Sequence, residues 1–135
     1  MFRVMLVEDD RIFREVLKQE LSQWFPSVMV DVASDGKEAM EKMDSDCPEL
    51  IFMDIRLPGE SGLQLTRKIK SKFPHALVAV LTSYDLPEYR QAAEESGASQ
   101  FFIKGMTNGS EIKWFVESVL GKNECRGPEP ILPGA

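Results

Sequence analysis

Three carboxylates stand together at the end of a short apolar run. Glu8, Asp9 and Asp10 directly follow residues 4–7 in the stretch LVEDD. Like charges this close repel one another and raise one another's pKa unless a cation lies among them. Carboxylate oxygens suit a hard divalent ion, and Mg²⁺ keeps coordination positions open for a phosphoryl group. The acidic stretch therefore predicts a magnesium site.

Polar side chains also end three later apolar runs. Asp54, Thr82 and Lys104 each stand at the end of such a run. A hydroxyl, an ammonium group and a bound cation can together contact the three non-bridging oxygens of a phosphoryl group in transfer. A carboxylate can itself attack phosphorus and form an acyl phosphate. If the fold brings these residues together, Asp54 is the candidate phosphoryl acceptor.

The spacing of apolar residues predicts how these side chains are positioned. Short apolar runs alternate with stretches whose apolar residues recur at helical spacing. Runs without strict alternation are typical of strands covered on both faces, and regular strand-to-helix alternation gives a parallel sheet. The predicted fold is a doubly wound α/β domain with five helices and a five-stranded parallel sheet. The predicted strands are residues 2–7, 28–33, 49–54, 76–82 and 99–104.

If the strands follow the order 2-1-3-4-5, the carboxyl ends of strands one, three, four and five lie side by side. Ligands of open α/β sheets bind at these ends, near the point where the strand order reverses. The polar residues that end the four strands are therefore expected to share one pocket. Asp10 is expected instead to cap the first helix, with its side chain accepting from amides of the first turn.

Composition and charge limit the classes of protein that fit. The chain has 135 residues, of which 43% are hydrophobic, and this suits one globular domain with one core. A net charge of −6 argues against direct binding to nucleic acid or to an anionic membrane. No apolar stretch approaches the roughly 20 residues of a spanning helix. The N-terminus turns acidic too early for a signal peptide, so the cytoplasm is the expected location.

The apolar pattern stops after Leu120. The last fifteen residues hold three Gly and three Pro, a composition typical of a tail or linker. We therefore expect the domain at residues 1–121 and a flexible tail, or the start of a linker, at 122–135. The two cysteines, Cys47 and Cys125, form no metal or disulfide pattern and are expected to be unpaired thiols.

Four stretches, VEDD, IFMDIRLPGESG, VLTSYD and FFIKG, together resemble the receiver domain of two-component response regulators. The resemblance covers residues 3 to about 120. The segment LTSYDLPEYRQAAEESGAS is further similar to receivers whose output domain is a LuxR-type helix-turn-helix. The resemblance implies a flavodoxin-like, CheY-like fold. It also implies a phosphoryl-accepting switch that assists its own phosphorylation and dephosphorylation without being a conventional enzyme.

The resemblance implies a phosphoryl donor and a set of metal ligands. A sensor histidine kinase or a phosphotransfer protein would phosphorylate Asp54. Asp9 and Asp54 would bind Mg²⁺, and Glu8 would contact the ion mostly through water or hydrogen bonds. The backbone carbonyl of Arg56 would be a further ligand.

The resemblance also implies a conformational switch. Thr82 matches the switch hydroxyl, Lys104 the invariant lysine and Phe101 the switch aromatic residue. Thr82 would move toward the phosphoryl group, Phe101 would turn inward, and the surface of the fourth helix, fifth strand and fifth helix would change. The expected readout is a phosphorylation-dependent homodimer and an effector, such as one controlling transcription. Trp114 falls opposite the apolar stripe of the last helix, either as a partner anchor or lying flat over Lys113.

Three positions beside the expected pocket stand out: Gly105, Arg56 and Tyr84. Gly105 stands where the family commonly has Pro after the lysine, so the resemblance does not give the shape of the loop after Lys104. Arg56 and Tyr84 lie two residues after Asp54 and Thr82, at positions that in the family influence how water reaches the acyl phosphate. We expect this bulky pair to shield the phosphoryl group and lengthen its life.

Three other functions would use similar residues or the same topology. A phosphatase with an Asp nucleophile would carry a second acid at the position of Arg56. A flavodoxin-like cofactor binder would need a phosphate loop rich in Ser, Thr and Gly after the first strand, where this chain is acidic. A pseudo-receiver that serves only for docking would have lost one of four residues, but all are present: Asp9, Asp54, Thr82 and Lys104. A stand-alone or non-phosphorylated docking module remains the alternative.

Overall fold

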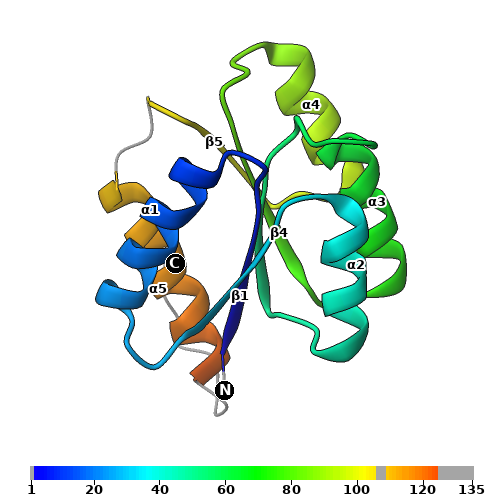
Figure 1. Cartoon of the computed structure of the whole chain (residues 1–135). Coiled ribbons are helices and arrows are strands. Elements are labelled where there is room, and N and C mark those ends of the chain that lie inside the picture. Colours follow the sequence, from blue (N-terminus) through cyan, green and yellow to red (C-terminus); the bar gives the residue numbers. More distant parts are fainter. Residues whose placement is uncertain (1, 106–108, 125–135) are drawn as a thin grey trace.

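The chain forms one parallel sheet covered by helices on both faces (Figure 1). The computed structural model describes residues 2–105 and 109–124, with side chains up to residue 121. In chain order, the elements are β1 Arg3–Val7, α1 Arg11–Trp24, β2 Met29–Ala33, α2 Gly36–Ser45, β3 Leu50–Met53, α3 Gly62–Lys72, β4 Leu77–Thr82, α4 Pro87–Ser96, β5 Gln100–Ile103 and α5 Gly109–Glu124.

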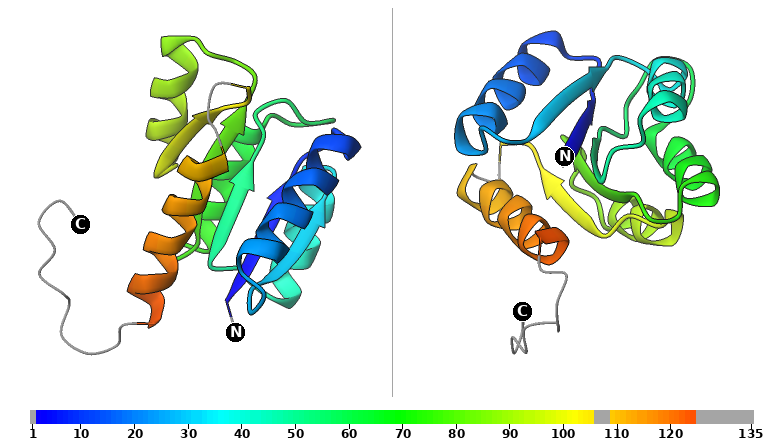
Figure 2. Two further views of the ribbon diagram at one scale, coloured as in Figure 1. Left: turned by 90° about the vertical axis from the view of Figure 1, so that its left-hand side faces the viewer. Right: turned by 90° about the horizontal axis from the view of Figure 1, so that it is seen from below.

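The sheet has the order β2-β1-β3-β4-β5, and every neighbouring pair of strands is parallel. The predicted fold class and strand order are therefore confirmed. Helices α1 and α5 cover one face, and α2, α3 and α4 lie on the other (Figures 1 and 2). Because β2 and β3 lie on opposite sides of β1, the strand order reverses between β1 and β3, where open α/β folds bind their ligands.

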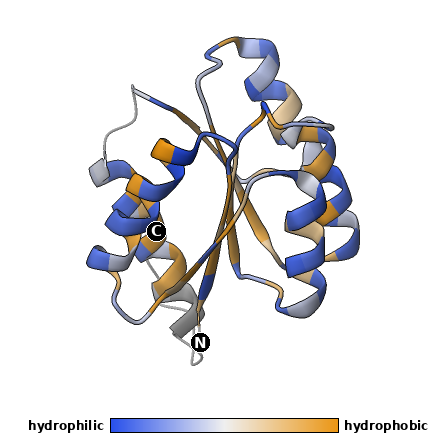
Figure 3. Ribbon diagram, in the orientation of Figure 1, coloured by the Kyte–Doolittle hydropathy of each residue, from blue (hydrophilic) through white to orange (hydrophobic). Residues whose placement is uncertain are grey.

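The central strands bury side chains on both faces, which explains their continuous apolar runs. In β1, Val4 and Leu6 pack in the core with α1 and α5, whereas Met5 and Val7 pack in the core with α2 and α3. Figure 3 shows the strands in the colours of apolar residues between helices with mixed faces. The edge strand β2 differs from the prediction, because Met29 is exposed at this free edge of the sheet.

Local hydrogen bonds fix where the helices begin and end. The Asp10 carboxylate accepts from the amides of Ile12 and Phe13 at 3.1 and 3.2 Å, so the predicted cap of α1 is confirmed. Gly97 ends α4 with a φ of 107°, a backbone conformation that L side chains rarely adopt. None of the described helices is long and apolar enough to cross a membrane.

Two predicted strands end one residue earlier than expected. β3 ends at Met53 and β5 at Ile103, so Asp54 and Lys104 follow the strands directly. Both residues still extend the ladder through their amides, since Asp54 N–H donates to the Val7 carbonyl at 3.0 Å and Lys104 N–H to the Thr82 carbonyl at 2.8 Å. These two bonds fix the backbone from which both side chains enter the site.

The predicted boundary between domain and tail remains a prediction. Helix α5 continues to Glu124, three residues beyond the expected end of the domain at residue 121. Residues 125–135 of the predicted tail, with Cys125, lie outside the described residues. Cys47 is exposed and unpaired within the part of the chain that the structure describes.

The start of α3 lies directly against the backbone of Asp54. Gly62 N–H donates to the Ile55 carbonyl at 2.7 Å, and a Cβ atom added to Gly62 would overlap the Asp54 carbonyl oxygen. The same added atom would lie 2.8 Å from the Asp54 carbonyl carbon, which is closer than real Cβ contacts. Only glycine therefore allows the loop after β3 to return this close to the site.

We expect Gly62→Ala to lower the free energy of unfolding by about 1–3 kcal/mol, because the backbone must shift to relieve the overlap. Urea unfolding of the purified protein measures this loss. Gly121→Ala is the matched control, since an added Cβ there meets nothing and alanine favours a helix. Equal midpoints for Gly62→Ala and the wild type would contradict the expected close approach.

Candidate functional site

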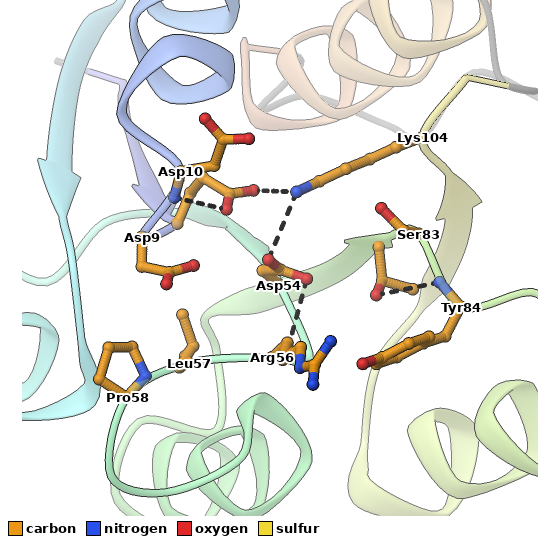
Figure 4. Close-up of a pocket in the computed structure, with 11 residues that line it drawn as sticks. Asp9, Asp10, Asp54, Arg56, Leu57, Pro58, Ser83, Tyr84 and Lys104 are labelled. Carbon is orange, nitrogen blue, oxygen red and sulfur yellow. Dashed lines mark hydrogen bonds and ion pairs between the residues drawn. The ribbon is translucent and has the colours of Figure 1, made fainter.

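A pocket of about 390 Å³ opens at the carboxyl ends of β1, β3, β4 and β5 (Figure 4). It brings together the polar strand-end residues that the sequence placed in one pocket. Its lining consists of Glu8, Asp9, Asp10, Asp54, Arg56, Leu57, Pro58, Thr82, Ser83, Tyr84 and Lys104. Phe101 and Trp114 lie outside this lining.

Three acidic side chains in the pocket could hold a cation. Glu8, Asp9 and Asp54 each offer a carboxylate oxygen, and these oxygens lie within 4.8 Å of one another. Glu8 and Asp54 are buried, whereas Asp9 is exposed. An all-oxygen donor set with two buried acids fits a hard divalent ion such as Mg²⁺. Asp10 contributes differently, because its carboxylate is engaged at the start of α1.

The ammonium group of Lys104 contacts both buried carboxylates. It forms an ion pair with Glu8 and another with Asp54 at 3.3 Å, reaching across the pocket in Figure 4. Burial raises the pKa of Glu8 to about 7, although Lys104 and the Asp10 amide act to lower it. Burial alone would lower the pKa of Lys104, but the two carboxylates outweigh it and leave this pKa raised. Lys104 therefore stays cationic between the acids.

Helix α1 supplies two supporting contacts that the sequence did not reveal. The Lys104 ammonium nitrogen lies 4.4 Å from the centre of the Phe13 ring, and Arg14 Nη1 donates to the Glu8 carbonyl at 2.9 Å. The sequence could not show which cation lies against the Phe13 ring, because this depends on how α1 is rotated against the sheet. The first contact helps to hold Lys104, and the second holds the backbone of Glu8, at the carboxyl end of the sheet.

Backbone amides orient the two side chains on which the predicted chemistry depends. Arg56 N–H donates to Asp54 Oδ1 at 3.4 Å, and Tyr84 N–H donates to Thr82 Oγ1 at 3.4 Å. Thr82 is buried at the end of β4. The predicted metal-ligand role of the Arg56 carbonyl stays a prediction, because no contact in the structure tests it.

Two bulky side chains meet at the mouth of the pocket. The guanidinium carbon of Arg56 lies 5.5 Å from the centre of the Tyr84 ring, and Figure 4 shows both side chains beside Asp54. The Tyr84 ring also stacks on Tyr89, with ring centres 5.1 Å apart and an interplanar angle of 20°. The predicted pair is thus assembled next to the site, with Tyr89 as an additional member.

The remaining predicted residues lie on the side of the domain formed by α4, β5 and α5. Phe101 is half-buried, and the guanidinium carbon of Arg90 lies 4.7 Å from the centre of its ring. Trp114 is 66% exposed and lines a groove of about 500 Å³ together with Phe101 and Phe102.

The loop after Lys104 uses the conformational freedom of glycine. Gly105 has a φ of 84°, in the left-handed region. Proline could not take this conformation, since its ring holds φ near −65°. The departure from the family pattern at this position therefore gives a turn that the usual residue does not allow. The residues that follow, 106–108, lie outside the described part of the chain.

Comparison with known proteins identifies the family and agrees with the fold. The family profile described as the response regulator receiver domain matches residues 4–113. The chain belongs to this family and is therefore a receiver domain of a two-component system. Response regulator MprA of Mycolicibacterium vanbaalenii is 34% identical over 102 residues, which are 76% of this chain and 43% of that protein. The chain thus spans less than half the length of this curated relative.

Solved structures with the same fold include two that are informative for the site and the output. Response regulator protein TrrA from Thermotoga maritima, solved in complex with Mg²⁺-BeF, is 33% identical with a TM-score of 0.77, covering 88% of this chain and 99% of that chain. A LuxR-family two-component response regulator from Aurantimonas is 29% identical with a TM-score of 0.80, covering 89% and 85% of the two chains.

Proposed function

We propose that this receiver is a phosphoryl-accepting switch and that Asp54 is its acceptor. The observation that carries the proposal is the position of the Asp54 carboxylate, which is buried, clusters with Glu8 and Asp9, and has Oδ2 3.3 Å from Lys104 Nζ. A carboxylate oxygen attacks the phosphorus of a phosphohistidine on a histidine kinase or phosphotransfer protein. The phosphorus–nitrogen bond breaks, the imidazole leaves with the electron pair, and an aspartyl phosphate remains.

Glu8, Asp9 and Asp54, with the backbone carbonyl of Arg56, would hold Mg²⁺. The cluster of three carboxylate oxygens supports this assignment. When bound, the ion neutralises the acids and the oxygens of the incoming phosphoryl group. Asp9 is the exposed member of the cluster, so it faces the side from which an ion enters, whereas Glu8 is already engaged by Lys104.

Lys104 and Thr82 would donate hydrogen bonds to the new phosphoryl group. Phosphorylation replaces one carboxylate charge by about two negative charges and three acceptor oxygens. Lys104, already 3.3 Å from Asp54, can donate to one of these oxygens, and the buried Thr82 hydroxyl can donate to another. Thr82 would then move toward the site, and Phe101, half-buried in the neighbouring strand, would turn inward.

Several contacts must combine to move this switch. Shifting the active form from 1% to 99% takes about 5.5 kcal/mol of differential binding. One hydrogen bond from Thr82 to a charged oxygen supplies roughly 1.5–3 kcal/mol. The lysine, the cation and a second copy of the domain would supply the rest. We propose that the phosphorylated form dimerises through the face of α4, β5 and α5, with Trp114 as an anchor, and controls an effector such as a transcription regulator.

Phosphorylation of Asp54 can be tested directly. With Mg²⁺ and acetyl phosphate, we expect the wild type to gain the mass of one phosphoryl group and Asp54→Asn to gain none, because the amide is a poor nucleophile. Mass spectrometry reads the adduct, and size-exclusion chromatography with beryllofluoride reads the oligomer. Asp10→Asn is the control, since asparagine also caps a helix. An unmodified wild type would favour the docking module instead.

The shield formed by Arg56 and Tyr84 gives a second expectation. In Arg56→Asn/Tyr84→Ala, water reaches the aspartyl phosphate more easily, and we expect its half-life to fall by about ten-fold, equivalent to roughly 1.4 kcal/mol in the barrier. Loss of the phosphoryl group from purified phosphoprotein measures this rate. A half-life that does not shorten would contradict the shield, and leave phosphorylation itself unaffected.

A further inference from the structure

Two consecutive residues of α4 contact the residues that the proposed switch uses. Tyr89 stacks on Tyr84 at the mouth of the pocket, and the Arg90 guanidinium lies over the ring of Phe101. Tyr89 is not among the residues that line the pocket, so its contact with the site runs through Tyr84. One turn of α4 thus contacts both the shield and the switch aromatic residue.

Helix α4 is attached at its beginning through ring contacts and through Tyr89, which packs against the buried cluster of Ile55, Val80 and Ala93. Its N-cap residue Leu86 makes no side-chain cap hydrogen bond and is half exposed. The buried side chains of the helix, Ala93 and Ser96, lie in its second half. Ring contacts with Tyr84 and Phe101 are therefore prominent among the interactions that hold the first turns of α4 against the domain. Movement of these turns must change the surroundings of both rings.

The Tyr84 ring contacts both Arg56 and Tyr89. Its amide donates to Thr82 Oγ1, its partly buried ring packs against the cluster of Ile55, Val80 and Ala93, and Arg56 beside it is exposed. The parallel stack with Tyr89 buries a face of the ring and restricts its rotamers, an effect that an exposed guanidinium gives only weakly.

We propose that Tyr89 is a positioning residue that holds the Tyr84 ring over the phosphorylated Asp54, and so makes the phosphoryl lifetime depend on the position of α4. This inference rests on the proposed function of Asp54 as acceptor. Arg90, the next residue of α4, contacts the Phe101 ring, so movement of this turn changes the surroundings of both rings together. A partner that binds α4 would therefore change the lifetime of the signal.

Nuclear magnetic resonance can test the stack without phosphorylation. Tyr84 and Tyr89 are the two tyrosines of the chain, so selective tyrosine labelling gives two ring signals. In Tyr89→Leu a single labelled ring remains, and we expect its signals to move toward the values of an unstacked tyrosine. Tyr89→Phe keeps an aromatic partner and should leave the Tyr84 signals near their wild-type positions. Unchanged Tyr84 signals in Tyr89→Leu would overturn the proposal.

Phosphoryl half-lives of the same variants complete the test. We expect Tyr89→Leu to shorten the half-life by about three- to ten-fold, the range that loss of one aromatic pair allows, with recovery in Tyr89→Phe. Tyr84→Ala/Tyr89→Leu should decay no faster than Tyr84→Ala, because Tyr89 acts through Tyr84. Glu95→Ala, an exposed position later in α4, is the control.

The outcomes separate the two proposals. A wild-type half-life in phosphorylated Tyr89→Leu, or faster decay in the double variant than in Tyr84→Ala, overturns the positioning role and leaves Asp54 as acceptor. Absence of phosphorylation in the wild type overturns the proposed function and, with it, any role of Tyr89 in protecting an acyl phosphate.

Discussion

One ammonium group between two buried carboxylates is the interaction on which the pocket depends. Lys104 pairs with Glu8 and with Asp54, and all three side chains are largely removed from water. Two buried acids side by side would be costly without a cation, and breaking such a pair leaves an uncompensated buried charge. Lys104 compensates for the burial of these acids only in part, since burial still raises the pKa of Glu8 to about 7. The exposed Asp9 adds a third carboxylate to the cluster, a donor set that suits a divalent ion.

The topology explains why these groups can meet. The acids come from the ends of β1 and β3 and the lysine from the end of β5, which lie in one sheet with parallel strands. Backbone hydrogen bonds join these ends to the neighbouring strands: the Asp54 amide donates to the Val7 carbonyl of β1, and the Lys104 amide donates to the Thr82 carbonyl of β4. The close approach of Gly62 to the Asp54 backbone then closes the loop below the site. The main chain therefore fixes the positions from which the charged side chains enter the pocket before any ligand binds.

Features determined by local patterning could be predicted from the sequence. Continuous apolar runs predicted the strands, and the short acidic side chain of Asp10 predicted the cap of α1. The gathering of strand-end residues followed from the strand order. Contacts made by helix faces could not be predicted, because they depend on how each helix is rotated against the sheet. The pairing of Lys104 with Phe13 and the stack of Tyr84 on Tyr89 are of this kind. The turn at Gly105 could not be predicted either, because the family commonly has proline at this position; the positive φ of Gly105 shows the turn.

The most direct test of this electrostatic account is the urea midpoint of the wild type and of Lys104→Met, each with and without Mg²⁺. An ion that binds the folded form stabilises it by mass action. We expect Lys104→Met to be less stable than the wild type without the ion, because two buried acids lose their partner. We also expect the variant to gain more stability from Mg²⁺ than the wild type does. Equal stability without the ion, or no effect of Mg²⁺ on either protein, would contradict this account.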